Sequence, residues 1–393
     1  MTTALHLVAG LDFNTLPQQL VNGLLLGAIY ALIALGYTMV YGVLKLINFA
    51  HGEVYMLGGY VALFVSYYLG FRPDKVGPTH SSIWNLLIML VACMVICSLV
   101  GVAIERFAYR PMRSHSRIAS LITAIGVSLL LQYGGALFLP NSPPPSISEL
   151  VNPYHGQSKD FTLVAPPASL KATVDSLKPA SDLAAANYKS WLDSHPGADT
   201  YNLPKDGDAL KHAAQDAKGK YEDAQHKLDT GGVRLIIQTG QAVMLISTIV
   251  LMGALTYMVL FTKRGRAMRA VSHDFDSASL MGVNVNSIVL FTFILGSSLA
   301  GAGAMMTATF LGTPLTTFYG LVPGVKAFTA AVLGGIGNIP GAVLGGLLMG
   351  MAENLVVWAG YSNYRDAIAF VVLIIVLLFR PGGLLGSSKV EKV

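Results

Sequence analysis

Long stretches without a charged side chain dominate this sequence and limit the folds that are open to it. Residues 13–44 contain no Asp, Glu, Lys or Arg, and about 20 apolar residues are enough for a helix to cross a bilayer. Further apolar blocks follow at residues 54–71, 81–104, 118–139, 235–261, 283–325, 326–353 and 367–379. We therefore expect an all-α polytopic membrane protein with about eight transmembrane blocks.

The composition agrees with a membrane protein and excludes other classes. Hydrophobic residues make up 53% of the chain and charged residues 12%, about half the charged share of an average soluble domain. The net charge of +5 does not indicate nucleic-acid binding, because the cations lie in short clusters at the ends of apolar blocks, as orientation signals do. Cys93 and Cys97 share one helical face of such a block, so we expect packing residues that form neither a metal site nor a disulfide.

Clusters of Lys and Arg predict which ends of the blocks face the cytoplasm, because these residues are retained on that side. Counting outward from the arginine-rich connection at residues 106–117 places the N-terminus outside, whereas the cations of the tail place the C-terminus inside. Two such ends require an odd number of crossings, which block 326–353 supplies if it re-enters or crosses twice. We interpret residues 106–117 as a topology anchor, with a second contact for a cytosolic partner as the alternative.

Residues 141–231 differ in composition from the rest and divide the chain into three parts. This segment opens with a proline-rich run and carries nine lysines, no arginine and twelve acidic residues. Long loops escape the positive-inside bias, and the topology makes this segment a polar extracytoplasmic (periplasmic) insert. It is either a small helical hairpin, with helices at 180–192 and 208–228, or a semi-flexible linker. Residues 1–140 and 232–393 form the N-terminal and C-terminal transmembrane halves.

Small residues at helical spacing predict where the helices pack closely. Two blocks carry such faces, formed by Gly23, Gly27 and Ala31 in the first block and by Gly296, Ala300 and Ala304 in block 283–325. Faces of this kind let two helix backbones approach each other within a membrane.

Two interruptions bring polar or helix-breaking residues close to apolar blocks. The first, residues 45–53, contains Asn48, His51 and Glu53. Ionisable groups at membrane depth usually face a cavity, but from the spacing alone we favour a plain interfacial loop. The second interruption contains Gly334, Gly335, Gly337, Asn338, Pro340 and Gly341. Because these residues break a helix, we favour a broken or re-entrant helix that lines a cavity over a loop at the membrane surface.

The segment 263–286 has the features of a cytoplasmic coupling loop. Four cations at its start mark the cytoplasmic face, and the part after them is short, polar and potentially helical. The pattern Asp276-Ser277-Ala278-x-x-x-Gly282 is similar to the Glu-Ala-Ala-x-x-x-Gly coupling loop of ABC-importer permeases. Small residues in this motif let a partner approach closely, and Gly282 ends the turn. The alternative is an ordinary loop after a cationic flank.

Four motifs in order carry a wider resemblance. They are residues 47–53 (INFAHGE), 265–270 (GRAMRA), 326–337 (KAFTAAVLGGIG) and 380–386 (RPGGLLG). Together they resemble the branched-chain amino acid ABC-importer permease family of the LivH type. The segment 141–231 is longer than the family pattern at that connection.

The resemblance implies a multi-pass protein of the bacterial inner (plasma) membrane that pairs with a second, different permease subunit. Two cytosolic ABC ATPases would dock on the coupling loop, and a periplasmic substrate-binding protein would deliver leucine, isoleucine or valine. Related permeases serve urea or short amides, which remain an alternative. The chain has no phosphate-binding loop, so we expect partner subunits to hydrolyse ATP and this chain to bind no cofactor.

Two groups of candidate residues follow. The candidates for coupling to the ATPase are Arg266, Arg269, Asp276, Ser277, Ala278 and Gly282. The candidates for the substrate path or its gate are Asn48, His51, Gly334, Gly335, Gly337, Asn338 and Glu353. The expected mechanism is alternating access driven by the ATPases, and the alternative is an ATP-independent secondary transporter or channel. We do not expect an enzyme or a metal site, because the sequence has no His-Glu-x-x-His helix and no Gly-x-Ser-x-Gly elbow.

Overall fold

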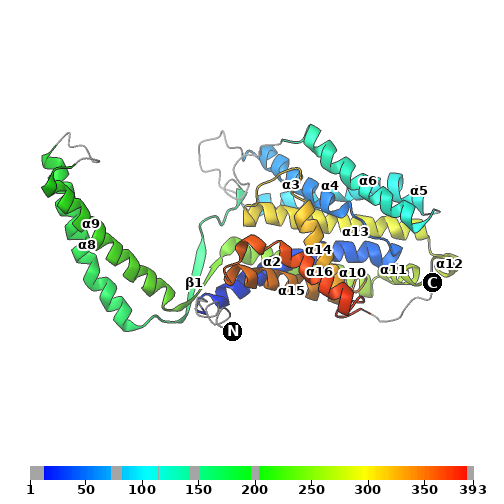
Figure 1. Ribbon diagram of the computed structural model, residues 1–393. Helices are drawn as coiled ribbons and strands as arrows, with labels where there is room; N and C mark the ends of the chain where they lie inside the picture. The colour runs from blue at the N-terminus through cyan, green and yellow to red at the C-terminus, as the bar shows by residue number, and fades with distance from the viewer. Residues whose placement is uncertain (1–12, 72–81, 114, 141–150, 196–202, 387–393) are drawn as a thin grey trace. The chain divides into compact units, whose positions relative to one another are not determined.

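The structure of the protein is a computed structural model that describes residues 13–71, 82–113, 115–140, 151–195 and 203–386. Over these residues the chain divides into two compact units, a larger one of residues 19–158 and 237 onward and a smaller one centred on residues 159–236. Helices make up most of the described chain, and its one sheet has two strands (Figure 1). The all-α polytopic architecture predicted from the sequence is confirmed.

Six helices of the described chain are long and apolar enough to cross a membrane. They are α2 (Leu16–Leu44), α4 (Ile83–Ile104), α6 (Arg117–Phe138), α10 (Thr239–Phe261), α13 (Val285–Met306) and α15 (Ile339–Trp358). Two of them continue through π-helical turns, α4 into η1 (Glu105–Tyr109) and α5 (Arg110–Met112), and α13 into η2 (Thr307–Leu311). The other apolar helices are α3 (His51–Tyr68), α14 (Leu321–Gly334) and α16 (Ala367–Phe379), the last preceded by the 3₁₀ turn η3 (Ser362–Tyr364).

The apolar blocks of the sequence coincide with these helices except around Lys326. Block 326–353 contains the end of α14 and most of α15, which run antiparallel after a turn at residues 335–338. The start of α14 belongs to the preceding block, so the two blocks hold three helices. Lys326 lies inside an apolar helix because two carboxylates neutralise it. The described chain thus has nine apolar helices, the odd number that termini on opposite faces require.

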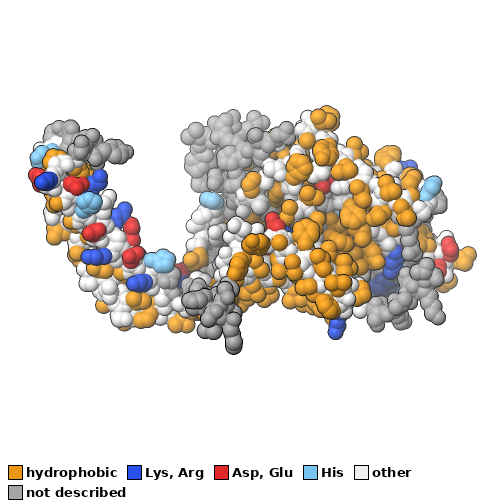
Figure 2. Space-filling model, in the orientation of Figure 1, with side chains coloured by type: hydrophobic (Ala, Val, Ile, Leu, Met, Phe, Trp, Pro, Cys, Tyr) orange, Lys and Arg blue, Asp and Glu red, His pale blue; other side chains and the backbone are white. Residues whose placement is uncertain are grey.

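Helices α2 and α13 form the centre of the larger unit. In their most apolar stretches 89% and 78% of the residues are buried, against 17% for α6 and 22% for α10. The peripheral helices turn Leu, Ile, Val and Phe side chains outward (Figure 2). Such a surface suits contact with lipid chains, which are as apolar as leucine.

Glycines bring the central helices together until their backbones touch. A Cβ at Gly27 of α2 would lie 2.7 Å from Leu347 Cα of α15, and a Cβ at Gly301 of α13 would lie 2.5 Å from the Cys93 carbonyl oxygen of α4. The small-residue faces predicted in the sequence are therefore packing faces. Cys93 and Cys97 lie in the same contact as buried free thiols, as expected.

The smaller unit is a helical hairpin with a short two-stranded ribbon. Its helices are α8 (Ala168–Ser194) and α9 (Lys205–Thr230), and its strands are β1 (Ser158–Val164) and β2 (Val233–Gln238). The Trp191 ring of α8 covers Gly207 of α9, where a Cβ would come within 2.4 Å of it. Of the two alternatives for residues 141–231, the hairpin is the one that forms in the described part, and Pro179 lies within α8. Its surface carries both signs of charge (Figure 2).

Candidate functional site

The segment 263–286 folds into two short helices with capped starts. α11 (Lys263–His273) begins after Thr262, whose Oγ1 accepts a hydrogen bond from Gly265 N at 3.1 Å. α12 (Phe275–Leu280) begins after Asp274, whose Oδ1 accepts one from Ser277 N at 2.6 Å. The bond from Ser277 favours the charged carboxylate and lowers the pKa of Asp274 from its ordinary value of 3.8. Each helix thus has a side chain that satisfies a free backbone N–H of its first turn.

Contacts with α10 hold α11 in place. A Cβ at Gly265 would lie 2.1 Å from the Val259 carbonyl oxygen, so only glycine fits this close approach. The Arg269 guanidinium donates hydrogen bonds to the carbonyl oxygens of Val259 and Leu260. These are carbonyls that the end of a helix leaves without a partner, and a cation there is also favoured by the helix dipole. The contacts tie α11 firmly to the end of α10.

The end of α12 presents two large apolar side chains to solvent. Leu280 is 88% exposed and Met281 is 85% exposed, while Ala278 packs inward. Gly282 follows with a φ of +83°, a left-handed conformation that ends a helix and suits glycine. In Figure 1, α12 lies beyond the ends of the long helices. Adjacent exposed apolar residues on such an element have the character of a protein contact.

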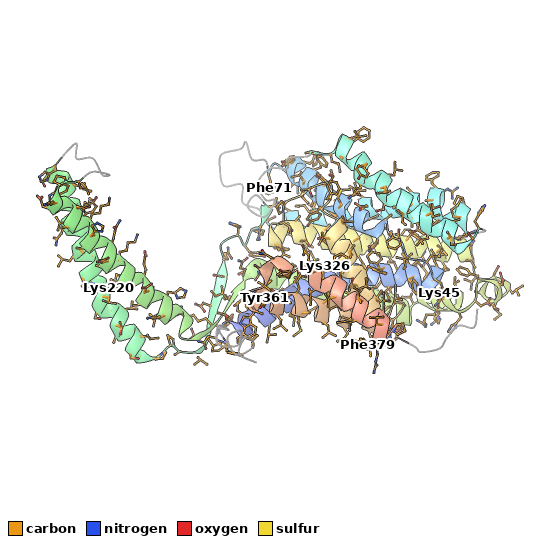
Figure 3. All side chains as sticks on the ribbon, viewed as in Figure 1. Lys45, Phe71, Lys220, Lys326, Tyr361 and Phe379 are labelled. Atoms are coloured by element: carbon orange, nitrogen blue, oxygen red, sulfur yellow. The ribbon has the colours of Figure 1, made fainter. Side chains whose placement is uncertain are left out.

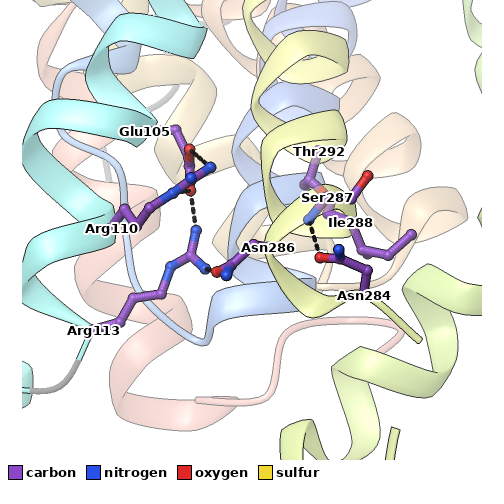
Figure 4. A network of polar contacts seen from close by, with 8 residues as sticks. All are labelled: Glu105, Arg110, Arg113, Asn284, Asn286, Ser287, Ile288 and Thr292. Atoms are coloured by element: carbon purple, nitrogen blue, oxygen red, sulfur yellow. Dashed lines mark hydrogen bonds and ion pairs between the residues drawn. The ribbon is translucent and has the colours of Figure 1, made fainter. Parts of the chain in front are cut away.

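An ion-pair network joins the arginine-rich connection to the end of the segment 263–286. Glu105 is fully buried, and its carboxylate pairs with Arg110, at 2.8 Å, and with Arg113. Arg113 also donates a hydrogen bond to Asn286 Oδ1 at 2.8 Å (Figure 4). Because Asn286 lies in the first turn of α13, this network fixes the start of α13 to the end of α4.

Helices α3 and α14 begin inside the bundle rather than at its surface. His51, the first residue of α3, packs on Gly36 about two turns before α2 ends. α14 begins beside it, where a Cβ at Gly320 would lie 1.9 Å from the Gly52 carbonyl oxygen. The preceding segments, 45–50 and 312–320, therefore re-enter the bundle, and they do so from opposite ends because α2 and α13 are antiparallel.

The two helix starts flank a cavity of about 270 Å³, which we term the interior cavity. Its lining is mostly apolar, and its polar members are Tyr37, Glu53, Ser128 and Gln132. Glu53 is 2% exposed, and its Oε1 accepts a hydrogen bond from Ser128 Oγ at 3.3 Å. Its Oε2 has no hydrogen-bond partner among the described residues.

The interfacial-loop interpretation of residues 45–53 was wrong. His51 is 1% exposed, and together with Glu53 it forms the buried first turn of α3. The missing side chain at Gly36 leaves the space that the His51 ring fills, so the chain turns back inside the bundle. The alternative, in which an ionisable residue of this interruption faces a cavity, is the one that forms, because Glu53 lines the interior cavity.

A second cavity, of about 570 Å³, lies beside α14 near the first turns of α2 and α10; we term it the outer cavity. Lys326 lines it and lies at intermediate depth, between the labelled Tyr361 and Lys45 (Figure 3). Both oxygens of Glu353 are occupied, Oε1 by Lys326 and Arg365 and Oε2 by the Tyr30 hydroxyl, which donates at 2.8 Å. This network joins α2, α14, α15 and the turn before α16.

A third cavity, of about 130 Å³, lies at the end of the bundle that the clusters of Lys and Arg predict to be cytoplasmic, and we term it the cytoplasmic cavity. Arg269 and Ser272 of α11 line it together with Gly42, Lys45 and Gly337. It therefore joins the coupling segment to the end of α2 and to the turn between α14 and α15.

The glycine-rich turn is packed against the end of the described chain. Gly335 and Gly337 have φ values of +105° and +93°, which glycine adopts without strain. Asn338 Nδ2 donates a hydrogen bond to the Leu385 carbonyl oxygen at 2.7 Å. The break predicted inside a helix at this place was wrong: residues 335–338 form a loop between two separate helices, α14 and α15, because the left-handed glycines turn the chain back. The re-entrant part of α14 is instead its start at Leu321.

The structure separates the candidate path residues into three places. His51 and Asn48 lie at or just before the start of α3, where Asn48 Oδ1 accepts a hydrogen bond from the Tyr109 hydroxyl at 3.1 Å. Gly334, Gly335, Gly337 and Asn338 form the glycine-rich turn, and Glu353 lies in the charge network with Lys326. The coupling candidates stay together on α11 and α12, where Arg266, Asp276, Ser277 and Gly282 are exposed.

Three residues with informative positions were not singled out in the sequence, namely Lys326, Leu280 and Met281, and Glu53 was noted there but not chosen as a candidate path residue. Leu280 and Met281 form an apolar pair within a polar segment, which is a visible signal. Glu53 lay within the interruption at residues 45–53, but only the structure shows that it lines a cavity. Lys326 gave no signal of its own, because its carboxylate partners are distant in sequence.

A bundle of apolar helices with two re-entrant segments, cavities lined by buried polar groups and an exposed element tied to one helix end is typical of a membrane transport protein. The family model of the branched-chain amino acid transport system permease component matches residues 19–377. The chain belongs to this family. It is a multi-pass protein of the inner membrane and one component of a transport system.

Individual relatives support the assignment. The chain is 36% identical to the high-affinity branched-chain amino acid transport system permease protein LivH of Escherichia coli K12, over 96% of this chain and 97% of LivH. It is 36% identical, over the same shares, to the corresponding permease protein BraD of Pseudomonas aeruginosa. The autoinducer 2 import system permease protein LsrC of Yersinia pseudotuberculosis is 32% identical over 34% of this chain and 39% of LsrC. No solved structure matches.

Proposed function

We propose that this chain is a permease subunit of an ATP-binding-cassette importer that moves leucine, isoleucine and valine across the inner membrane. The observation that carries the proposal is the element formed by α11 and α12, which is capped, tied to α10 and tipped by exposed Leu280 and Met281. An element held in this way transmits a push from a soluble partner into the bundle. The names of the relatives supply the substrate class.

The proposed assembly contains two permease subunits, two cytosolic ABC ATPases and a periplasmic substrate-binding protein. This chain would be one member of a permease heterodimer. Its sequence has no phosphate-binding loop, so ATP would be hydrolysed by the partners. The chain itself would bind no cofactor and carry no catalytic activity.

The coupling route runs from α12 through α11 to the cytoplasmic cavity. Asp276, Ser277 and Arg266 would face the ATPase, while the buried Ala278 and the left-handed conformation of Gly282 would set the shape of α12. Arg269 ties α11 to α10 and also lines the cytoplasmic cavity. A displacement of α11 would therefore alter the wall of that cavity.

The glycine-rich turn would act as the gate at this end. Gly337 lines the cytoplasmic cavity together with Arg269 and Ser272. Together with Gly334, Gly335 and Asn338 it forms a turn that side chains of α11 can displace. In alternating access, the gate would open the interior cavity, near Asn48 and His51, to the cytoplasm. Glu353 would hold α15 and α14 together during this change.

The docking proposal is tested by replacing both exposed apolar residues at the tip of α12. The double variant Leu280→Asp/Met281→Asp should recover less than about a tenth of the ATPase that the unmodified chain retains on co-purification. The reason is that a few residues supply most of the binding energy of a protein contact. The control is Leu183→Asp on α8, where the leucine is 63% exposed, and it should retain the ATPase fully. Undiminished recovery with the double variant would show that α12 is not the docking element.

The substrate is tested with the complete importer in proteoliposomes. The proposal predicts saturable, ATP-dependent uptake of leucine, isoleucine and valine when the binding protein is present. Uptake of urea or short amides with no uptake of these three amino acids would replace the proposed substrate class.

A further inference from the structure

We propose that the interior cavity is a binding site for an α-amino acid zwitterion with an aliphatic side chain, in which Glu53 pairs with the ammonium group of the substrate. The inference rests on the proposed function, because it assigns a binding site to the substrate that the permease moves. Four features of the cavity support it: a carboxylate with a vacant oxygen, aromatic walls, an uncapped helix start and an apolar wall on α6.

The first feature is the missing partner of Glu53. Its Oε2 is buried and accepts no hydrogen bond from any residue that the structure describes, and no Lys or Arg lines the cavity. A buried carboxylate is costly unless a cation pairs with it, and ionisable residues inside a membrane bundle commonly mark a substrate or ion path. Elsewhere in this bundle buried carboxylates are fully paired, as Glu353 is with Lys326 and Arg365. The cation for Glu53 would therefore arrive with the substrate.

The second feature is the aromatic wall of the same cavity. Phe328 lies between Tyr37 and Phe49, with ring centroids 6.0 Å and 6.2 Å away, and all three line the cavity. Aromatic faces attract a cation within about 6 Å of the ring. An ammonium group next to Glu53 would thus be surrounded by groups that favour positive charge.

The third feature is the start of α14, which enters the cavity without a cap. Gly320 precedes α14 and makes no side-chain cap, the first turn of α14 has no acidic residue, and Gly320, Leu321 and Gly324 all line the cavity. The start of a helix carries partial positive charge, which favours an anion. In α14 the Leu321 N–H is bonded to the Phe318 carbonyl oxygen and Pro323 has no N–H, so the dipole rather than free N–H groups would attract the anion. The first turn of α3, in contrast, already contains an acidic residue, Glu53. The start of α14 is therefore the place for the substrate carboxylate.

The fourth feature is the aliphatic part of the cavity lining. Ile125 and Leu129 of α6 and Val325 of α14 supply aliphatic surface. A volume of about 270 Å³ is close to the lower limit of about 300 Å³ for ligand pockets, which fits one amino acid. The cavity thus offers an anion for the ammonium, a helix start for the carboxylate and an apolar surface for the side chain.

The charge of Glu53 is tested in the complete importer with ATPases and binding protein. Glu53→Gln keeps the volume and removes the charge, and it should lower leucine uptake by about 30-fold or more, as expected when one partner of a buried charge pair is lost. The ATPases should still co-purify with this variant, which shows that the complex assembles. Glu53→Asp should restore part of the uptake. The matched control is Ser66→Ala, also buried on α3 but outside the cavity lining, and it should transport like the unmodified complex.

Direct occupancy is tested with Leu129→Cys, which places a reactive thiol on the cavity wall while Cys93 and Cys97 stay buried. Leucine should protect this thiol from N-ethylmaleimide, and 3-methylbutylamine, which keeps the amine, should protect at higher concentration. 4-Methylpentanoate, which lacks the amine, should not protect. In the Glu53→Gln background, protection by leucine should be lost.

The outcomes separate the inference from the function on which it rests. If the unmodified importer shows no ATP-dependent leucine uptake, the proposed function fails and the inference fails with it. If the importer transports leucine and Glu53→Gln transports equally well, the inference is overturned while the function stands. If Glu53→Gln does not assemble, the analogues decide with the native Glu53 in place: equal protection by leucine and 4-methylpentanoate, or protection by neither, overturns the proposal.

Discussion

Lys326 and Glu353 form an ion pair inside the bundle, with Lys326 Nζ 2.7 Å from Glu353 Oε1 and both side chains almost completely buried. Asp366 accepts a second bond from Lys326 at 2.6 Å, and Arg365 shares the Glu353 oxygen. Two cations and two carboxylates thus balance each other next to the outer cavity. The arrangement explains how a charged residue lies within an apolar helix.

Replacing Lys326 should lower the stability of the protein more than replacing an exposed charged residue does. In Lys326→Met the apolar stem is kept, but Glu353 loses a buried partner, and breaking a buried pair in this way costs about 3–5 kcal/mol. Thermal unfolding in detergent should therefore occur at a clearly lower temperature. Lys220→Met on the exposed surface of α9 (Figure 3) is the control and should leave the transition unchanged. Equal transitions for both variants would contradict the role assigned to the pair.

The glycine contact between α2 and α15 should not tolerate a methyl group. In Gly27→Ala the new Cβ would lie 2.7 Å from Leu347 Cα, and overpacking against backbone costs about 1–3 kcal/mol. Gly253→Ala in α10 is the matched control, because nothing lies within 4 Å of its Cβ position. Alanine there should stabilise the helix by about 0.5–1 kcal/mol. A melting temperature that rises in both variants would refute the close approach.

The ion-pair network of Glu105 predicts a difference between two arginines of the connection at residues 106–117. Arg113→Gln removes one of the two cations on buried Glu105 and the bond to Asn286, so we expect a loss of about 1–3 kcal/mol. Arg106→Gln, at an exposed position one residue after Glu105, should change the free energy of unfolding little. Chemical denaturation of the two variants measures the difference, and an equal effect would place Glu105 outside the network.

The cap on α12 predicts a pH dependence that is confined to this helix. The pKa of Asp274 is lowered in the folded protein by the hydrogen bond from Ser277 N. The cap therefore stabilises α12 fully above the ordinary value of 3.8, and this contribution is lost as the pH falls through the lower, folded pKa.

Hydrogen exchange measures the same cap at neutral pH. Asp274→Ala should speed exchange of the amides of residues 277–280 while α11 stays protected, because Thr262 caps α11 separately. If exchange in α12 does not change in this variant, Asp274 does not cap the helix.

The fold was largely predictable from the sequence because most of its signals are local. Uncharged blocks indicated the spans, and small-residue spacing indicated the faces on which Gly27 and Gly301 pack. The helical character of residues 263–280 and the turn at Gly282 were also expected from the sequence. Each of these patterns depends on neighbours within one helix or one turn.

The features that the sequence did not predict depend on contacts between residues that are far apart in the chain. The predicted apolar blocks were separated at Lys326, which in fact lies within α14. Nothing near it in the sequence shows that Glu353 and Asp366 neutralise its charge. The re-entrant starts of α3 and α14 meet at Gly52 and Gly320, a contact that no local pattern encodes. For the same reason Glu53 resembled an interfacial residue until the cavity around it was known.

The central claim is that this chain is a passage whose movement is driven from the cytosol through α12. The most direct measurement is the initial rate of leucine uptake into proteoliposomes that contain either the purified chain alone or the complete importer with ATP. The account predicts ATP-dependent uptake by the complete importer and none above background by the chain alone. Equal rates in the two preparations, independent of ATP, would contradict it.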